Sequence, residues 1–340
     1  MHSPVDTATV VAPLTCGIAM CTCNGGAFLR VQLESLVNQS RQPLQVVISD
    51  DASDDGSWEV IEQWAREVRA STSIEVLVLR NEPRLGVRRN FQQAIEQLRT
   101  DVIFLADQDD VWSASKIEVI ACRMEALPDV LLVHTDADLI DEQGRDLGKS
   151  LFEALCISKL EQDLIAEARF FEVYCRRNLV TGTTAAFRRE LLALALPIPE
   201  DWIHDEWLAA CAAASKTVAM LPDRLTQYRQ HGTNAIGVPT NLFARLVHYG
   251  RRVRKTPHDE HLRYKRRRIG ALRERLAGCV GVEPCKLSLL DEAVSHFDRR
   301  IAFPHGLPGR VAGILREFRM HGYHRFADGY GGVLRDLVRL

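Results

Sequence analysis

The sequence lacks any long apolar run and any recognisable export signal. No stretch reaches the roughly 18 consecutive apolar residues that a membrane-spanning helix needs. Residues 1–13 have neither the basic start nor the apolar core of a secretory signal peptide. We therefore expect a cytoplasmic protein, which could still lie peripherally on the inner membrane.

Three common catalytic motifs are also absent. The sequence has no Gly-x-x-x-x-Gly-Lys-Ser/Thr phosphate loop, no Gly-x-Gly-x-x-Gly dinucleotide turn and no Gly-x-Ser-x-Gly nucleophile turn. These absences argue against kinases with that loop, the usual dehydrogenases and hydrolases with that turn. The nine cysteines are odd in number and match no zinc spacing, so we interpret them as reduced thiols.

The composition is ordinary for a globular protein, but the charge is unevenly distributed. Of the 340 residues, 46% are hydrophobic and 26% are charged. The formal net charge is -2, yet residues 241–340 hold 21 Lys and Arg against 10 Asp and Glu, whereas residues 1–240 carry a net charge of -13. An acidic body with a basic end is informative about partners rather than about fold.

Short apolar runs alternate with helical patterns over the first 140 residues. The runs predict five strands, at residues 16–20, 44–49, 74–79, 102–106 and 130–134. Apolar residues at helical spacing lie between them; Ser57 and Ser113 are placed to cap two of these helices, and Trp58 belongs to a predicted buried stripe. The pattern predicts an α/β fold, a mostly parallel, Rossmann-like sheet with helices on both faces. In such sheets ligands bind beyond the carboxyl ends of the strands.

Two polar loops follow the first two predicted strands. The first, Thr22-Cys23-Asn24-Gly25-Gly26, could approach a nucleotide closely, or it could be a plain strand-to-helix turn. The second reads Asp50-Asp51-Ala52-Ser53-Asp54-Asp55-Gly56, and Asp50 is best placed to accept hydrogen bonds from a base or ribose. Four carboxylates are costly to crowd without a partner, although a solvated loop with helix caps is the alternative.

The loop after the fourth predicted strand is the strongest candidate for a metal site. It reads Asp107-Gln108-Asp109-Asp110-Val111-Trp112, with three carboxylates in four residues. Mg²⁺ or Mn²⁺ is commonly held by one or two carboxylates, with substrate phosphates completing the shell. An acidic helix cap would explain Asp110, but it poorly explains Asp107 together with Asp109.

Two later segments gather further polar side chains. His204-Asp205-Glu206-Trp207-Leu208 holds two acids, and it could also be a helix start whose acids favour the helix dipole. Tyr228-Arg229-Gln230-His231-Gly232-Thr233-Asn234 contains an arginine and a histidine that could meet a diphosphate or a metal.

Taken in order, these segments resemble the family 2 glycosyltransferases of the GT-A fold over about residues 14–237. The Met20–Gly26 loop resembles the family's first loop, Asp50-Asp51-Ala52-Ser53 its Asp-Asp-x-Ser, and Asp107–Trp112 its Asp-x-Asp region. Thr181-Gly182-Thr183 resembles the acceptor-side glycine loop, and His204–Leu208 lies where the family has Glu-Asp-x-x-Leu. The Asp-Gln-Asp-Asp-x-Trp and Tyr-Arg-Gln-His-Gly-x-Asn forms are similar to a bacterial rhamnosyltransferase-like branch that builds surface polysaccharides such as O-antigen.

This resemblance implies an inverting, metal-dependent transfer of a sugar from a UDP- or dTDP-linked donor to a glycan hydroxyl. It places Asp205 as the catalytic base, with Glu206 as its rival because the family's preceding Glu is His204 here. The implied metal ligands are Asp109, Asp107 and His231. The implied nucleotide-sugar contacts are Thr22, Asn24, Gly25, Asp50, Asp51, Ser53, Asp107, Gln108 and Arg229. The implied acceptor-side residues are Thr181, Gly182, Thr183 and Trp207.

We divide the chain into an N-terminal tail (1–13), a GT-A domain (14–240) and a basic, mainly helical C-terminal region (241–340). The basic region suits a lipid-linked acceptor at an anionic membrane surface; a solvated helix face is the alternative, and we expect no nucleic acid partner. Two other functions stay open. A nucleotidyltransferase would need a lysine in its glycine-rich loop, and residues 22–26 have none; a non-catalytic subunit of the same fold should have lost the base or the metal-binding Asp.

Overall fold

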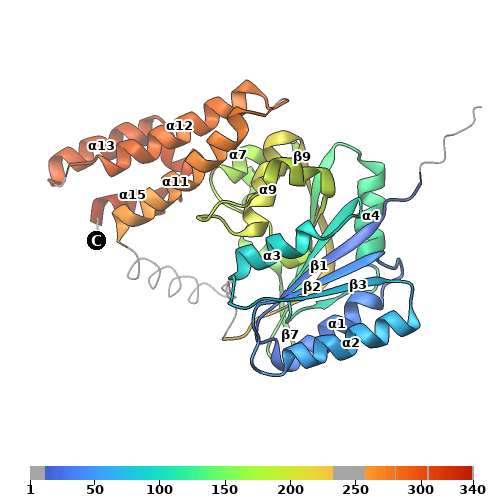
Figure 1. The fold of residues 1–340 in the computed structure, drawn as a ribbon. Helices are drawn as coiled ribbons and strands as arrows, with labels where there is room; N and C mark the ends of the chain where they lie inside the picture. Colours follow the sequence, from blue (N-terminus) through green and yellow to red (C-terminus); the bar gives the residue numbers. More distant parts are fainter. Residues whose placement is uncertain (1–11, 233–256, 280, 305, 339–340) are drawn as a thin grey trace, which may run out of the picture.

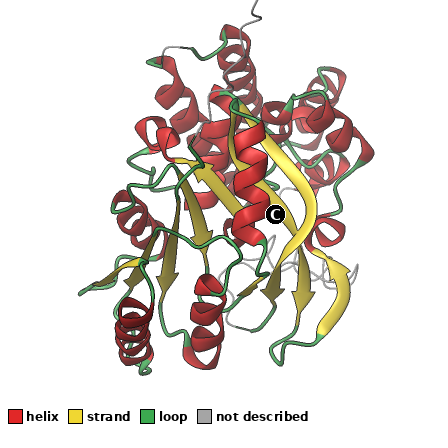
Figure 2. Cartoon of the chain, turned by 90° about the vertical axis from the view of Figure 1, so that its right-hand side faces the viewer, coloured by secondary structure: helices red, strands yellow, loops and turns green. Residues whose placement is uncertain are grey.

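A nine-stranded mixed sheet forms the body of the protein in the computed structural model, which describes residues 12–232, 257–279, 281–304 and 306–338 (Figures 1 and 2). The strand order is β3-β2-β1-β4-β8-β6-β9-β5, with β7 paired to β6. The strands are β1 (Cys16–Thr22), β2 (Gln45–Asp50), β3 (Glu75–Arg80), β4 (Val102–Ala106), β5 (Val111–Trp112), β6 (Val130–Ile140), β7 (Asp146–Ser150), β8 (Ala185–Arg188) and β9 (Thr217–Arg229).

The first half of the sheet is parallel, as the alternating pattern predicts. Strand β1 pairs in parallel with β2 and β4, and β2 pairs in parallel with β3. All five predicted strands are present, and their bounds agree closely except that β6 continues to Ile140. The carboxyl ends of β1, β2 and β4 therefore lie side by side, which brings their polar loops together.

The second half of the sheet makes it mixed rather than mostly parallel. Strand β8 lies between β4 and β6 and is antiparallel to both, whereas β6 and β9 are parallel. Strand β5 is antiparallel to β9. The apolar pattern does not reveal β5, β7, β8 or β9, because these strands are short or carry exposed polar residues.

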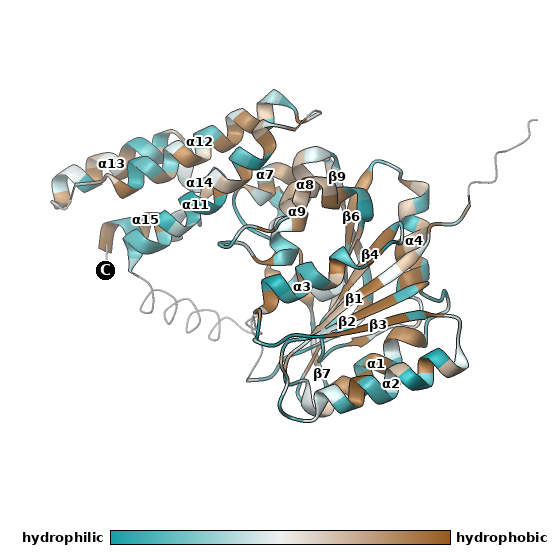
Figure 3. Cartoon of the chain, viewed as in Figure 1, coloured by the Kyte–Doolittle hydropathy of each residue, from teal (hydrophilic) through white to brown (hydrophobic). Residues whose placement is uncertain are grey.

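Helices cover both faces of the sheet, and alternating side chains of each strand feed two core clusters. Ile18 and Met20 point to the cluster under α1, α2 and α4, whereas Ala19 and Cys21 point to the one under α3 and α9. Figure 3 shows the strands as largely hydrophobic. The helices of this body are α1 (Leu29–Val37), α2 (Ser57–Ser71), α3 (Val87–Glu96), α4 (Lys116–Ala126), α5 (Leu151–Leu155), α6 (Lys159–Ala166), α7 (Phe170–Tyr174), α8 (Leu192–Ala195) and α9 (His204–Ser215).

Two predicted helix caps and one predicted core residue are wrong. Helix α2 is preceded by Gly56 in a left-handed conformation, and the Ser57 hydroxyl instead accepts a hydrogen bond from the Gly25 amide at 2.9 Å. Helix α4 begins after Ser115 rather than Ser113. Trp58 is half-buried beneath the Arg80 guanidinium, 5.3 Å from the ring centroid, because it lies at the edge of the apolar stripe.

The C-terminal helices join the core of the body directly. They are α11 (His258–Ala277), α12 (Pro284–Ile301), α13 (Leu307–Arg319), α14 (Gly322–Phe326) and α15 (Tyr330–Val338), and Figure 1 shows them beside α7 and α9. Apolar residues of α11 and α12 belong to the same buried cluster as α9. The predicted boundary at residues 240–241 and the basic run 251–255 lie outside the described residues, so the division into domains stays a prediction.

Two further findings bear on the nature of the chain. All nine cysteines are free thiols, as predicted. Within the described ranges, no helix combines the length and the apolar character that crossing a bilayer would require.

Candidate functional site

The loops after β1 and β4 are joined by one amide side chain. Gln108 Oε1 accepts hydrogen bonds from the Thr22 hydroxyl at 2.8 Å and from the Cys23 amide at 2.7 Å. Its Nε2 donates to the Cys23 carbonyl at 3.2 Å. A Cβ atom at Gly25 would lie 3.2 Å from Thr22 Oγ1 and 3.3 Å from Gln108 Oε1, so this close approach favours glycine.

The loop after β2 braces the loop after β1 from the other side. The Asn24 amide donates to Ser53 Oγ at 2.8 Å, and Asn24 Oδ1 accepts from the Asp54 amide at 3.0 Å. Asn24 itself takes a positive φ of 56°, which asparagine tolerates better than most residues. The predicted nucleotide-binding residues of these three loops therefore form one hydrogen-bonded edge.

Asp50 and Asp51 are both buried and both organise their surroundings. The Asp50 oxygens accept from the Ser53 amide at 3.0 Å and from the Ser53 hydroxyl at 2.5 Å. The Asp51 oxygens accept from the amides of Leu85 and Gly86 at 2.7 and 2.8 Å. Direct contact of either carboxylate with a base stays a prediction, and in this geometry both carboxylates fix the loop around them.

The acidic loop after β4 meets the end of β9. Asp109 Oδ2 lies 2.7 Å from His231 Nε2, and both side chains are largely buried. Asp110 is fully buried, and its Oδ1 accepts from the Arg229 amide at 2.9 Å. Two of the three predicted metal ligands are thus in contact, although no three His, Cys, Asp or Glu side chains of the described residues gather into a metal cluster.

This acidic loop is electrostatically strained. Burial, together with the negative charges of Asp110, Asp109 and Asp205, raises the pKa of Asp107 well above its usual range. Burial and the Asp109 charge raise the pKa of Asp110 to about 7. A group of carboxylates with raised pKa values is typical of a site that binds a cation.

A fully buried lysine lies under this loop. Lys116 Nζ donates to the Thr183 carbonyl at 2.5 Å and to Thr226 Oγ1 at 2.9 Å, and it lies 3.8 Å from the centroid of the Trp112 ring. Burial lowers the pKa of Lys116 well below its usual range, against the opposing charges of Asp110 and Asp107. This side chain joins the acidic loop, the 181–184 turn and β9.

Asp205 begins the buried helix α9 and faces the predicted acceptor-side turn. Its Oδ2 accepts from the Gly182 amide at 2.9 Å and its Oδ1 from the Glu206 amide at 2.7 Å. Burial and the neighbouring Glu206 charge raise the pKa of Asp205 to about 7. A Cβ atom at Gly182 would lie 3.5 Å from Asp205 Oδ2 and 3.2 Å from His204 Nε2, so the turn passes close to both residues.

The rival carboxylate, Glu206, is held by the C-terminal region. It forms an ion pair with Arg268 of α11. The Arg268 guanidinium lies 3.9 Å from the Trp202 ring centroid, and the Arg268 carbonyl accepts from the Trp202 indole at 3.1 Å. Glu206 is thus paired with a cation, whereas within the described part of the chain only backbone amides donate to Asp205, as expected of a base.

Three residues that the sequence analysis singles out make their contacts within the protein itself. The Arg229 guanidinium donates to the carbonyls of Asp109, Asp141 and Glu142, so it holds two loops together. Trp207 is fully buried and its indole donates to the Ala195 carbonyl, which does not support contact with an acceptor. The His204 ring stacks on Phe91 at 3.7 Å, and burial lowers its pKa to about 3, so it is neutral.

Sequence reasoning misses two residues at this site. Lys116 lies three residues after the predicted helix cap Ser113, and the only hint of its burial is that it precedes Ile120 by one helical turn. Arg268 lies in a basic run that gives no sign of its partner 62 residues away. Both contacts depend on long-range packing.

Comparison with known proteins bears on the family of this chain. Residues 17–194, just over half of the chain, match the family model described as glycosyl transferase family 2. A dTDP-rhamnosyl transferase, RfbG of Shigella flexneri, is 30% identical over 244 residues, which cover 68% of this chain and 78% of that protein. An uncharacterized glycosyltransferase of Nostoc sp. is 26% identical over 62% of this chain. This chain spans only 63% of that relative's length.

Solved structures share the fold at low sequence identity. S. aureus TarS (residues 1–349), in complex with UDP-GlcNAc, matches with a TM-score of 0.55 and 13% identity, over 95% of this chain and 82% of that one. The mannosyltransferase PcManGT of Pyrobaculum calidifontis, in complex with GDP-Man and Mn²⁺, matches with a TM-score of 0.51 and 18% identity, over 93% of this chain and 79% of that one. The α/β sheet with its helical C-terminal region is thus the predicted GT-A type of fold. The chain belongs to glycosyl transferase family 2.

Proposed function

We propose that this protein transfers a sugar from a nucleoside diphosphate donor to a hydroxyl group of a glycan acceptor, with inversion at the anomeric carbon. The observation that carries the proposal is the placement of Asp205. Its carboxylate is oriented by the Gly182 amide, has a pKa raised to about 7, and lies close enough to the acidic loop to raise the pKa of Asp107. A base and a candidate cation site at the same edge of the sheet suit glycosyl transfer to an acceptor hydroxyl.

In the proposed mechanism Asp205 removes the proton from the attacking hydroxyl. The acceptor oxygen forms a bond to the anomeric carbon as the bond to the diphosphate oxygen breaks, and the leaving electron pair stays on the diphosphate. A base with a pKa near the working pH is best suited to such a proton transfer. The reaction passes through an oxocarbenium-like state, as glycoside hydrolysis does.

Asp109 and His231 are the residues that would hold a divalent cation, with Asp107 nearby. A carboxylate and an imidazole 2.7 Å apart are donors that Mn²⁺ and, through the carboxylate, Mg²⁺ accept. With only two protein donors in contact, diphosphate oxygens would complete the shell. When bound, the cation supplies positive charge against the departing diphosphate.

The donor side consists of the three interlocked loops. We assign Thr22, Asn24, Gly25, Ser53 and Gln108 to donor binding, because their hydrogen bonds form one continuous edge. Asp50 and Asp51 shape that edge by holding Ser53 and the 85–86 amides. A UDP- or dTDP-linked donor is the proposed substrate, and the likeness to a dTDP-rhamnosyl transferase supports rhamnose as the narrower proposal.

The acceptor side is the 181–184 turn. Thr181, Gly182 and Thr183 lie between Asp205 and the buried Lys116, so an acceptor hydroxyl presented at this turn would meet the Asp205 carboxylate. A glycan carried on a lipid during surface polysaccharide synthesis is the acceptor we propose.

A panel of nucleotide sugars tests this function. The purified protein is incubated with UDP-, dTDP- and GDP-linked sugars and a glycan acceptor, with Mn²⁺ or with a chelator, and both the released nucleoside diphosphate and the glycosylated product are measured. We expect both products in equal amounts with one UDP- or dTDP-linked sugar, and neither product with the chelator. Release of a nucleoside monophosphate or pyrophosphate instead would favour a nucleotidyltransferase.

A further inference from the structure

Exposed apolar side chains are concentrated in the last three helices. Thirteen large hydrophobic residues are exposed in the described ranges, and eight of them lie within residues 307–338. These eight are Leu307, Leu315, Phe318, Met320, Tyr330, Leu334, Leu337 and Val338. Such a concentration in one region of a water-exposed surface is typical of an interaction site.

Several of these side chains lie close to one another rather than at isolated positions. Leu315 and Phe318 are three residues apart on α13, and Tyr330 and Leu334 are four apart on α15, so each pair shares a helix face. The rings of Phe318 and Tyr330 lie 5.9 Å apart, which joins the two helices. We call the surface of Leu315, Phe318, Met320, Tyr330 and Leu334 the α13–α15 face.

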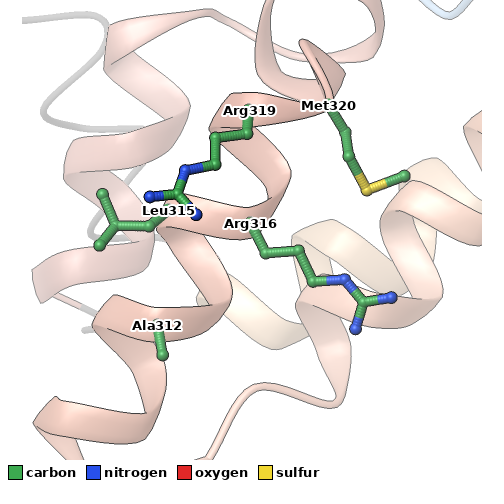
Figure 4. Close-up of a pocket in the computed structure, with 5 residues that line it drawn as sticks. All are labelled: Ala312, Leu315, Arg316, Arg319 and Met320. Carbon is green, nitrogen blue, oxygen red and sulfur yellow. The ribbon is translucent and has the colours of Figure 1, made fainter.

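The same surface is positively charged. Arg316 and Arg319 are exposed on α13, and with Ala312, Leu315 and Met320 they line a shallow depression (Figure 4). The acids of these two helices, Glu317 and Asp336, are each 1% exposed and paired with basic side chains. Helices α13 and α15 therefore expose cations and apolar groups but no carboxylate; Asp328, in the turn between α14 and α15, is the nearest exposed acid in sequence.

Four arginines of α11, by contrast, form ion pairs within the protein. Arg266, Arg267 and Arg268 pair with Asp298, Asp201 and Glu206. Arg273 pairs with Asp291. These four arginines of α11 thus neutralise acids of this chain, whereas Arg316 and Arg319 of α13 lie exposed beside apolar side chains.

We propose that the α13–α15 face binds the surface of an anionic lipid bilayer. Leucine, aromatic and methionine side chains would enter the boundary between headgroups and acyl chains, with Arg316 and Arg319 beside lipid phosphates. A second copy of the chain fits less well, because a two-fold contact through this face would oppose arginine to arginine. The inference rests on the proposed function only in that a membrane-borne acceptor would be met there.

The test is co-sedimentation of the full chain with vesicles of phosphatidylcholine alone or with phosphatidylglycerol added. We expect binding to the anionic vesicles, weakened by salt, and little binding to the neutral ones. Two variants divide the face: Leu315→Ser with Leu334→Ser removes apolar groups, and Arg316→Gln with Arg319→Gln removes charge. Each should weaken partitioning on the order of tenfold or more.

A charge-matched control removes two arginines elsewhere. Arg266→Gln with Arg273→Gln changes the net charge equally but lies in ion pairs on α11, so it should retain wild-type binding. Loss of binding in the control as great as in the Arg316 and Arg319 variant would overturn the proposal, as would equal binding of all variants or no binding of the wild type. A lipid-free dimer that dissociates in the Leu315 and Leu334 variant would instead identify the face as a contact between copies.

The outcome is independent of the transfer reaction. The altered side chains are exposed or, in the case of Arg273, partly exposed, so thermal unfolding and turnover with a short, soluble acceptor should stay close to wild-type values in all three variants. If vesicle binding behaves as expected while no sugar is transferred, the proposed function fails and the membrane surface stands. If transfer to the soluble acceptor proceeds while vesicle binding is absent, only this inference fails.

Discussion

Two regions of the protein bury carboxylates in opposite ways. At the edge of the sheet, Asp107, Asp110 and Asp205 lie close together, and burial raises their pKa values. Among the C-terminal helices, Arg300, His258 and Tyr323 hydrogen-bond to Asp336, and Arg299 and His296 to Glu317. Despite burial, these partners lower the pKa values of Asp336 and Glu317 to about 2.

This difference in the pKa values of buried carboxylates distinguishes a ligand-binding site from a network that stabilises the fold. A buried carboxylate with basic partners is already neutralised, and removing one partner leaves an uncompensated charge. A buried carboxylate without such partners carries its electrostatic cost until a ligand brings the missing positive charge. The electrostatics of the acidic loop therefore favour binding of a cation, and those of Asp205 favour binding of a proton. The Asp336 and Glu317 networks instead hold helices together.

Asp109→Ala should have the largest effect on activity. We expect no measurable sugar transfer, because the variant removes the carboxylate that contacts His231 and would hold the cation. Calorimetry with the donor, with and without Mn²⁺, should show that metal-dependent binding is lost. Asp54→Ala, which removes an exposed acid of the neighbouring loop, is the control and should bind like the wild type. Unchanged metal dependence in Asp109→Ala would refute the assignment.

Asp205→Asn should lower turnover at least about 100-fold, the contribution typical of a general base, while donor affinity stays nearly intact. The amide keeps an oxygen that can accept from the Gly182 N–H, so the turn should keep its place. Glu206→Gln should lower turnover less, because Glu206 is already paired with Arg268. Steady-state kinetics and donor titration of both variants decide between the two acids; a larger loss of turnover in Glu206→Gln would make Glu206 the base.

The same substitution at two buried carboxylates should change stability in opposite directions. Asp336→Asn should lower the free energy of unfolding by about 3 kcal/mol, since the buried Arg300 guanidinium loses its counter-charge. Asp110→Asn should be neutral or stabilising in metal-free buffer, because it removes one of the crowded negative charges and its oxygen can still accept from the Arg229 amide. Urea unfolding in a chelator measures both, and a destabilised Asp110→Asn would weaken the contrast drawn above.

Much of the fold follows from local sequence. The strands at residues 16–22, 45–50, 75–80 and 102–106 are apolar runs between helical patterns, so their parallel pairing and the meeting of their loops could be predicted. The position of β8 could not. It lies between β4 and β6 through backbone pairing with residues 50 or more positions away, and nothing in Ala185–Arg188 encodes that neighbour.

The candidate site shows the same division. Carboxylates after strand ends are visible as local patterns, which is why Asp107, Asp109 and Asp205 could be proposed from sequence. Local patterns reveal neither the contacts of Lys116 and Arg268 nor the burial of Trp207, since the surroundings of all three are set by tertiary packing. From sequence alone a charged residue is expected to be exposed, and an aromatic residue near a site is expected to contact the ligand. Only the packing of neighbouring helices shows that such residues are buried.

The smallest effect we expect is on the pH dependence of stability without metal, and the two regions should produce opposite limbs. The pKa of Asp336 is about 2 in the folded protein and near 3.8 ordinarily, so its contribution is present above pH 4 and is lost as the pH falls toward 2. That loss amounts to on the order of 2 kcal/mol.

Asp110 behaves in the opposite sense: its folded pKa of about 7 lies above the ordinary 3.8, so stability falls as the pH rises from about 4 through 7. Burial also lowers the pKa values of His134 and His204 to about 3, so the curve of the wild type alone mixes several contributions. Urea unfolding from pH 2 to 8 is therefore compared between each variant and the wild type, because the shared contributions cancel in the difference. Asp336→Asn should lose less stability relative to the wild type as the pH falls from 4 toward 2, and Asp110→Asn should gain stability relative to the wild type as the pH rises from 4 to 7. Donor with Mn²⁺ should reduce the second difference by supplying the missing positive charge. A difference between Asp110→Asn and the metal-free wild type that stays constant from pH 4 to 7 would mean that Asp110 is not under electrostatic strain.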